Sequence, residues 1–420
     1  MTRRNAVLVT LGVFCIAFAA YALSPVKTSY DSRWVLHTAM SIAHGKGGDL
    51  SDYNDTLDRS KFYATRHMGG RPYNLFPVGP PLLVMPAVIV WDRIDPSFSS
   101  RLHNGGWEGP EKFLASVIGA AAVAVFFWLI FGQFGHLYVA AGSAFIFAFC
   151  TSMWSTATRA LWQHGPLVLM LLIAMLLLQR AQRRPALIQY VSLPLAFAFI
   201  TRPTAAIPVA FISAYVAIYF RKWIVKYLAW SALIAIPWLA YNYSIYQSLF
   251  PDYFNTYAGE RDFWQGLLGN LVSPSRGLLI FSPILILSIS GFVLAMRERE
   301  SRPLYLAYGA IVVLMIMVMA GAPMWWGGHS YGPRFTTDIL PFVAFFMSFT
   351  LMYFSGLGHR ARNAFLGITV VLVLVSFAMH YRGATSSSAL DWNVIPNNVD
   401  SNLHRFWDWR DPQFLRNVLR

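Results

Sequence analysis

Long apolar runs are the feature that most constrains the fold of this chain. They recur along the whole sequence, and a run of about 17 to 25 residues can carry a helix across a membrane with its backbone groups paired internally. Hydrophobic side chains make up 56% of the 420 residues and charged side chains only 12%. These shares differ strongly from those of a soluble globular domain. The sequence therefore predicts an all-α polytopic membrane protein.

Basic residues predict how the chain is threaded. The formal net charge is +14, and much of the excess lies in short links between apolar runs. These basic links are at residues 3–4, 180–184, 221–226, 297–302 and 360–362. Such links tend to remain in the cytoplasm, so the charge reflects topology and does not indicate a nucleic-acid partner. The N-terminus is then cytoplasmic and the C-terminus periplasmic, in a bacterial inner membrane.

The same rule predicts about eleven spans. Residues 186–220 lie between two basic links, so this run crosses twice and turns at Arg202. The predicted spans are 6–24, 112–132, 137–153, 164–179, 186–200, 203–220, 223–244, 277–296, 303–321, 338–356 and 363–380. The apolar segment 74–91 is not counted, because a further crossing would invert every later link and its four prolines disfavour a straight helix. We expect it to lie on the outer membrane surface.

This threading divides the chain into a membrane module at 1–380, with a large outer loop at 25–111, and a periplasmic tail at 381–420 packed on the module. The outer loop begins with a predicted amphipathic helix at 32–45, in which Trp34 faces lipid or core while Arg33 and His37 face water. The segments expected outside the membrane, called the outer segments below, are 25–111, 154–163, the turn at Arg202, 247–276, 323–337 and 381–420.

Polar chemistry is concentrated in the outer segments, because the predicted spans contain almost no acidic residues. An ion-coupled transporter usually places ionisable groups at mid-membrane. A flippase or transporter of lipid-linked saccharides would need a polar path towards the inside, which the sequence does not provide. The pattern therefore favours chemistry at the outer surface.

Several motifs lie in the outer segments. They are "TSYDSRW" at 28–34, "YNLFPVGPPLL" at 73–83, "TRALWQHGP" at 158–166, "SPSRGLLIFSP" at 273–283, "WWGGHSYGPRF" at 325–335 and "RFWDWRDPQFLR" at 405–416. Together with the early span they resemble the membrane glycosyltransferases of the GT-C superfamily, which use polyprenyl-phosphate-linked sugars. The resemblance implies the GT-C fold and an inverting transfer of a sugar to a glycan, lipid-linked or protein acceptor on the periplasmic face. An O-antigen ligase or polymerase, with a pyrophosphate donor, is the chemically close alternative.

The resemblance assigns the catalytic base to Asp31, the acid that follows the first span. From the residues alone, Asp31 could equally be a solvated loop acid or the N-cap of a helix that starts at Ser32. Many relatives carry a second acid at the position of Ser32, so this chain favours a single base over a metal-binding pair. No cofactor is firmly implied, and a divalent cation held by Asp31 and the donor phosphate is the less favoured alternative.

The remaining candidates are basic and aromatic residues at the outer ends of spans. Arg202, Arg276 and Arg334 are predicted to bind the donor phosphate, since guanidinium groups match phosphate oxygens; lipid-headgroup anchors are the alternative. Predicted substrate contacts are Tyr30, Arg33, Trp34, His164, Trp325, Trp326, His329 and Tyr331. For the aromatic residues an interfacial belt is the competing interpretation, and for the histidines a structural hydrogen bond.

Overall fold

The computed structural model describes residues 3–27, 29–55, 64–255 and 262–417. In this part of the chain the structure is almost entirely helical. The helices, in chain order, are α1 (Arg3–Leu23), α2 (Val35–Ala43), α4 (Gly79–Ile94), α5 (Phe98–His103), α6 (Glu108–Phe134), α7 (Leu137–Phe149), α8 (His164–Ala181), α9 (Ser192–Thr201), α10 (Ala206–Tyr219), α11 (Ile224–Tyr246), α12 (Phe263–Val272), α13 (Leu278–Phe281), α14 (Leu287–Ala295), α15 (Arg302–Ala320), α16 (Leu340–Ser355), α17 (His359–Thr385) and α18 (Ser388–Asp391). The strands β1 (Thr65–Met68) and β2 (Arg71–Asn74) form an antiparallel hairpin.

Each predicted span coincides with helical structure, and the span 277–296 covers both α13 and α14. Within the described residues, six helical stretches are long and apolar enough to cross a membrane, and five shorter apolar ones coincide with the other predicted spans. This confirms the all-helical membrane class, while the number of crossings stays a prediction. The segment 74–91 begins at the last residue of β2 and forms most of α4, which packs against α2 and α9.

Local sequence explains how neighbouring helices are joined. Gly135 ends α6 with a left-handed φ of 65°, a conformation that costs glycine little. The next residue, His136, caps α7, because its Nδ1 atom accepts a hydrogen bond from the backbone N–H of Val139 at 3.3 Å. The two helices therefore reverse direction within two residues and pack side by side.

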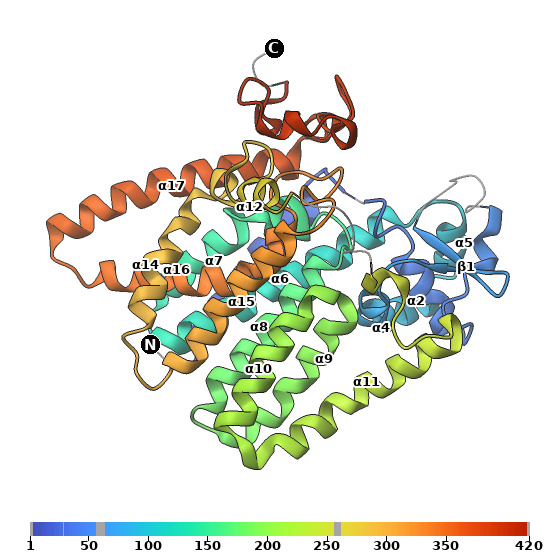
Figure 1. Cartoon of the computed structure of the whole chain (residues 1–420), viewed down its shortest axis with the longest axis horizontal. Helices are drawn as coiled ribbons and strands as arrows, with labels where there is room; N and C mark the ends of the chain where they lie inside the picture. The colour runs from blue at the N-terminus through green and yellow to red at the C-terminus, as the bar shows by residue number, and fades with distance from the viewer. Residues whose placement is uncertain (1–2, 28, 56–63, 256–261, 418–420) are drawn as a thin grey trace.

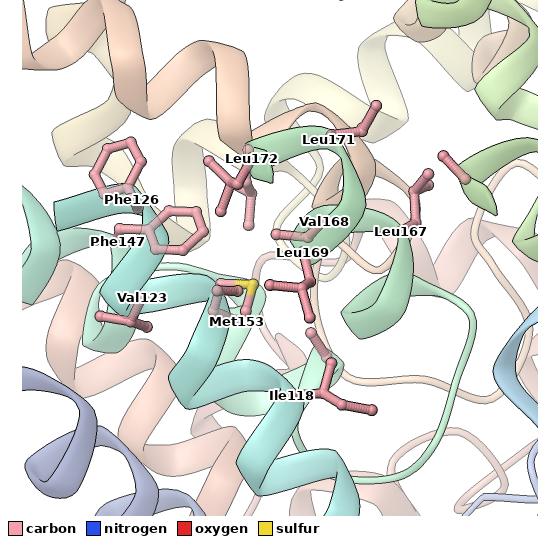
Figure 2. Packing of buried hydrophobic residues seen from close by; sticks show 14 of the residues in the cluster. Ile118, Val123, Phe126, Phe147, Met153, Leu167, Val168, Leu169, Leu171 and Leu172 are labelled. Carbon is pink, nitrogen blue, oxygen red and sulfur yellow. The ribbon is translucent and has the colours of Figure 1, made fainter. Parts of the chain in front are cut away.

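The hydrophobic core lies between α6, α7 and α8. Figure 2 shows Phe126 of α6 beside Phe147 of α7, with Leu172 of α8 and Met153 packed close to them. The two phenyl rings stack with their centres 4.5 Å apart. Such interdigitated packing replaces the hydrophobic effect as the main attraction between helices in lipid, so it fixes the positions of the helix ends from which the site is built.

The two ends of the bundle differ in the way that the charge pattern predicts. Figure 1 shows α12 and the C-terminal tail at one end, and the α10–α11 and α14–α15 turns at the other. These two turns contain the basic links at 221–226 and 297–302. The basic links at 221–226 and 297–302 thus lie at the end of the bundle opposite to α12 and the tail.

One prediction about the outer loop is wrong. The helix α2 begins at Val35 instead of Ser32, and His37 is fully buried instead of facing water. Its ring nitrogens lie 3.1 Å from the carbonyl oxygen of Arg33 and 3.2 Å from that of Leu102, and burial lowers its pKa to about 4. The cause is that α4, α5 and β2 cover α2 from several sides, so this helix has no water-facing stripe for His37.

The crossing of α14 and α16 provides a test of the packing. A Cβ atom added to Gly291 would lie 1.8 Å from the carbonyl oxygen of Phe346, so Gly291→Ala must push the two helices apart. We expect a loss of about 1 to 3 kcal/mol of stability, typical of overpacking, measured as a lower thermal unfolding temperature in detergent. Gly367→Ala in α17 is the control, because a Cβ atom there meets nothing within 4 Å. Equal shifts in the two variants would contradict the packing argument.

Candidate functional site

The outer segments enclose one large cavity of about 1130 Å³. Every outer segment contributes to its wall. The lining includes Tyr30, Asp31, Phe76, Arg159, Trp162, Arg202, Tyr253, His329, Arg334, Asn393 and Asp400. Since these residues are far apart in the sequence, their convergence supports the prediction that the six segments share one side of the bundle.

Asp31 lies in the turn between α1 and α2 and lines this cavity. It does not cap α2, because the N-cap residue of that helix is Trp34, without a side-chain hydrogen bond. Its side chain is only 19% exposed, and its Oδ2 atom accepts a hydrogen bond from Nη2 of Arg334 in an ion pair. Asp31 is therefore neither a helix cap nor a solvated loop acid.

Ser32, which follows Asp31 in the sequence, contacts a different residue. Its side chain is buried, and its hydroxyl oxygen lies 3.0 Å from that of Ser29. Within the described residues, no three His, Cys, Asp or Glu side chains lie close enough together to hold a metal ion.

Arg334 is held by several groups besides Asp31. Its Nη1 atom donates to the carbonyl oxygen of Gly327 at 3.1 Å, and its Nε atom donates to Nε2 of His164 at 3.3 Å. The guanidinium carbon lies 4.1 Å from the ring centre of Trp162, a cation–π contact. Arg334 is thus fixed in place at the cavity wall, as its predicted role requires.

Behind the arginine lies a fully buried carboxylate, Asp338, in the 3₁₀ turn Phe335–Ile339 that precedes α16. Its Oδ1 atom lies 2.6 Å from Nδ1 of His164, and its Oδ2 atom accepts from Nε of Arg202 at 2.5 Å and from the hydroxyl of Thr204 at 3.2 Å. Because Nε2 of His164 accepts from Arg334, the imidazole proton is on Nδ1 and points at Asp338. Asp338 and His164 therefore connect Arg202 to Arg334.

Arg202 occupies the tight turn that the sequence predicts. It ends α9 in an extended conformation, is 3% exposed, and lines the cavity. Besides Asp338, its Nη1 atom donates to Oε1 of Gln163 at 3.2 Å. His164, by contrast, is buried behind Arg334 and does not line the cavity, so it supports the arginines and is not placed to touch a substrate.

Arg159 is an arginine of the cavity wall that the sequence analysis did not predict. It stands in the motif "TRALWQHGP", lines the cavity, and has its guanidinium carbon 4.9 Å from the ring centre of Trp162. Burial is the main reason that its pKa falls to about 10; Arg334 lowers it further, and Glu111 and Asp31 oppose the shift. It remains protonated at neutral pH. Arg159, Arg202 and Arg334 are called the arginine cluster below.

Two of the other predicted substrate contacts line the cavity. Tyr30 is 68% exposed, and His329 is partly exposed with Nε2 3.1 Å from Oδ2 of Asp400. Arg33 and Trp34 do not line it: Trp34 is fully buried, and the guanidinium carbon of Arg33 lies 4.6 Å from the ring centre of Trp107. The backbone turn directs Asp31 and these two neighbours in different directions.

Arg276 is not placed to bind a phosphate, contrary to the prediction. It is 1% exposed, does not line the cavity, and its guanidinium makes five hydrogen bonds, as many as it has N–H groups. The acceptors are the carbonyl oxygens of Trp326, Ser275 and Gly328 and the side chains of Gln413 and Asn393. Burial lowers its pKa to about 9, so it stays charged and joins the tail to the membrane module.

The aromatic residues of "WWGGHSYGPRF" are buried as well. Trp325 and Trp326 pack with Trp392 and Phe406 of the tail, and the indole N–H of Trp326 donates to Oδ1 of Asp400 at 2.8 Å. The hydroxyl of Tyr331 donates to the carbonyl oxygen of Met379 at 2.7 Å. None of the three lines the cavity, so the predicted sugar stacking on them has no support and they act as packing residues.

Comparison with known proteins agrees with the architecture. No family model and no curated protein matches the chain. Among solved structures it is similar to ArnT from Cupriavidus metallidurans, crystallised with undecaprenyl phosphate bound, with a TM-score of 0.55 and 14% sequence identity. The match covers 94% of this chain and 66% of the ArnT chain. The likeness shows the fold: the chain has the GT-C fold that its motifs predict.

The revised role of Arg276 can be tested by Arg276→Lys. Lysine keeps the charge but offers three N–H donors instead of five, so the acceptors in the tail lose buried hydrogen bonds worth about 1 kcal/mol each. We expect roughly tenfold faster proteolytic cleavage within residues 388–417, since about 1.4 kcal/mol corresponds to a factor of ten.

The control for this variant is Arg410→Lys, which changes an exposed arginine of the same tail. Its cleavage rate should equal that of the unchanged protein. Equal cleavage of both variants would show that Arg276 does not hold the tail.

Proposed function

We propose that this protein, with the GT-C fold, transfers a sugar from a polyprenyl-phosphate donor to a hydroxyl acceptor in the cavity beside Asp31, on the periplasmic face of a bacterial inner membrane. The observation that carries the proposal is the convergence of Asp31 with the arginine cluster on one cavity. A carboxylate that takes a proton and cations that receive an anionic leaving group are the two parts that this reaction needs.

In the proposed reaction, the acceptor oxygen attacks the anomeric carbon of the sugar while its proton passes to Asp31. The bond between the anomeric carbon and the phosphate oxygen breaks, and its electron pair leaves with the polyprenyl phosphate. Attack from the side opposite the phosphate inverts the configuration. Guanidinium groups fixed in advance at the position of the leaving phosphate stabilise the developing charge more strongly than mobile water does.

The charges of the cluster favour a phosphate donor over a pyrophosphate donor. Its three guanidinium groups face two carboxylates, Asp31 and Asp338, so these five groups carry one positive charge in excess. Asp391 and Asp400 add two further carboxylates to the cavity wall, and these disfavour a doubly charged donor. Glu111 and Lys112 are buried behind Arg159 and cancel each other. A sugar phosphodiester carries one negative charge and a sugar pyrophosphate two, so the phosphodiester matches the excess and the pyrophosphate exceeds it.

The bound lipid of the structural neighbour supports the same class of donor. ArnT was crystallised with undecaprenyl phosphate, and we infer that a related lipid binds here with its phosphate at the arginine cluster. The proposed acceptor is a glycan, a lipid-linked saccharide or a protein that enters from the aqueous side. The tail at 381–420 is proposed to close that side, since Asn393 and Asp400 line the cavity.

The role of Asp31 predicts a clear result for Asp31→Asn. Asparagine has nearly the same shape but cannot take the proton, so we expect release of polyprenyl phosphate from a panel of polyprenyl-phosphate sugars to fall by at least about 100-fold. The control is Asp92→Asn, an acid of α4 whose Oδ2 lies 2.9 Å from Nε2 of His44. Normal turnover by folded Asp31→Asn protein would remove Asp31 from the mechanism.

The charge match predicts the class of donor. When the purified protein receives the same sugar on polyprenyl phosphate and on polyprenyl pyrophosphate, we expect only the phosphate-linked sugar to be consumed. Mass spectrometry of the extracted lipids distinguishes the two products. Release of polyprenyl pyrophosphate would instead support a ligase or polymerase reaction.

A further inference from the structure

We infer that the ion pair with Arg334 blocks the catalytic base Asp31, and that the donor phosphate breaks this pair when it binds. This block of Asp31 by Arg334 is called the mask below. The inference rests on the proposed function and adds an order of events to it. Before the donor arrives, Oδ2 of Asp31 accepts a hydrogen bond from Nη2 of Arg334. The positive charge of Arg334 weakens the attraction of this carboxylate for the proton of an acceptor hydroxyl, so Asp31 can engage the acceptor fully only after the donor phosphate has replaced it as the acceptor of Nη2.

The first support is the difference between the two arginine–aspartate pairs of the site. Arg202 and Asp338 are almost completely buried, with 3% and 0% of their side chains exposed, whereas Arg334 and Asp31 are 15% and 19% exposed. Breaking a buried pair strands a charge away from water and costs several kcal/mol, while partly exposed pairs cost much less. The pair that includes the base is thus the one that can exchange partners.

The second support is that Arg334 and Asp31 both line the cavity into which the donor is proposed to bind. A phosphate oxygen that enters the cavity can reach the guanidinium from the open side. Phosphate offers the same kind of charged acceptor as a carboxylate, and can accept two parallel hydrogen bonds from arginine. The exchange therefore replaces one charged hydrogen bond of Arg334 by another.

The third support is the fixed position of Arg334. Gly327 and His164 accept hydrogen bonds from Nη1 and Nε, and Trp162 lies under the guanidinium. These contacts can persist when Nη2 changes its acceptor, so no large movement is needed. Arg159 lies close enough to Arg334 and Asp31 for both charges to shift its pKa. It supplies a second cation that balances the phosphate beside the released carboxylate.

The inference has an unusual consequence for Asp31→Asn: the substitution that stops turnover should strengthen binding of undecaprenyl phosphate. It removes the competitor for Nη2 of Arg334 and a negative charge near the phosphate. We expect the dissociation constant for undecaprenyl phosphate to fall roughly tenfold, equivalent to about 1.4 kcal/mol. Titration calorimetry of the full chain in nanodiscs measures it, and Asp31→Ser serves as a second variant if Asp31→Asn does not fold.

Two controls separate the ion pair from a general effect of charge. Asp391→Asn removes an equal charge from another residue that lines the cavity, and should change the dissociation constant much less than Asp31→Asn does. Arg334→Gln should weaken binding, and Asp31→Asn added to Arg334→Gln should no longer produce most of the tightening. This double-mutant cycle isolates the coupling between the two residues.

The possible outcomes distinguish this inference from the proposed function. If the unchanged protein binds undecaprenyl phosphate but Asp31→Asn matches Asp391→Asn or binds more weakly, the mask does not exist and the proposed function stands. If the unchanged protein and all variants fail to bind undecaprenyl phosphate, the proposed function fails and the inference falls with it. Tightening that persists in the Arg334→Gln background also overturns the mask.

Discussion

The rest of the site depends on the hydrogen bonds that the buried carboxylate of Asp338 accepts. Asp338 stands two residues before α16 and accepts hydrogen bonds from the side chains of His164, Arg202 and Thr204, which come from the start of α8 and from the turn after α9. A carboxylate removed from water is stable only when its oxygens are paired, so these segments must meet at one point. Through His164, the same carboxylate also orients Arg334. The geometry of the cavity wall thus follows from one satisfied charge.

Much of this architecture follows from the sequence, because membrane helices depend on long-range rules that a single chain displays. Apolar length and basic links determine which segments are helical and which ends lie together. The resemblance of the motifs then identified the fold and placed Asp31, Arg202 and Arg334, which line the cavity. In each case the residue type and its place at the end of a span were enough to predict that the residue belongs to the site.

The predictions that failed concern the groups that a side chain contacts inside the folded protein, which sequence patterns do not display. Arg276 and Arg334 occur in similar glycine- and aromatic-rich motifs, yet Arg276 uses its five hydrogen bonds inside the protein while Arg334 reaches the cavity. Trp325 and Trp326 are covered by the tail, whose packing no local pattern specifies. Arg159 was overlooked although its motif was recognised, because nothing in the motif distinguishes an arginine that lines a cavity from one that is covered by its neighbours.

The composition of the cavity wall has a consequence for the biogenesis of the protein. Asp31 is synthesised early, whereas Asn393 and Asp400 of the same wall belong to the tail, which leaves the ribosome long after the first helices have formed. The pocket is therefore assembled last, when the tail has docked on Arg276. A nascent chain that still lacks these residues has its first helices and Asp31 but an open cavity, so the cavity wall is complete only after the tail has been made.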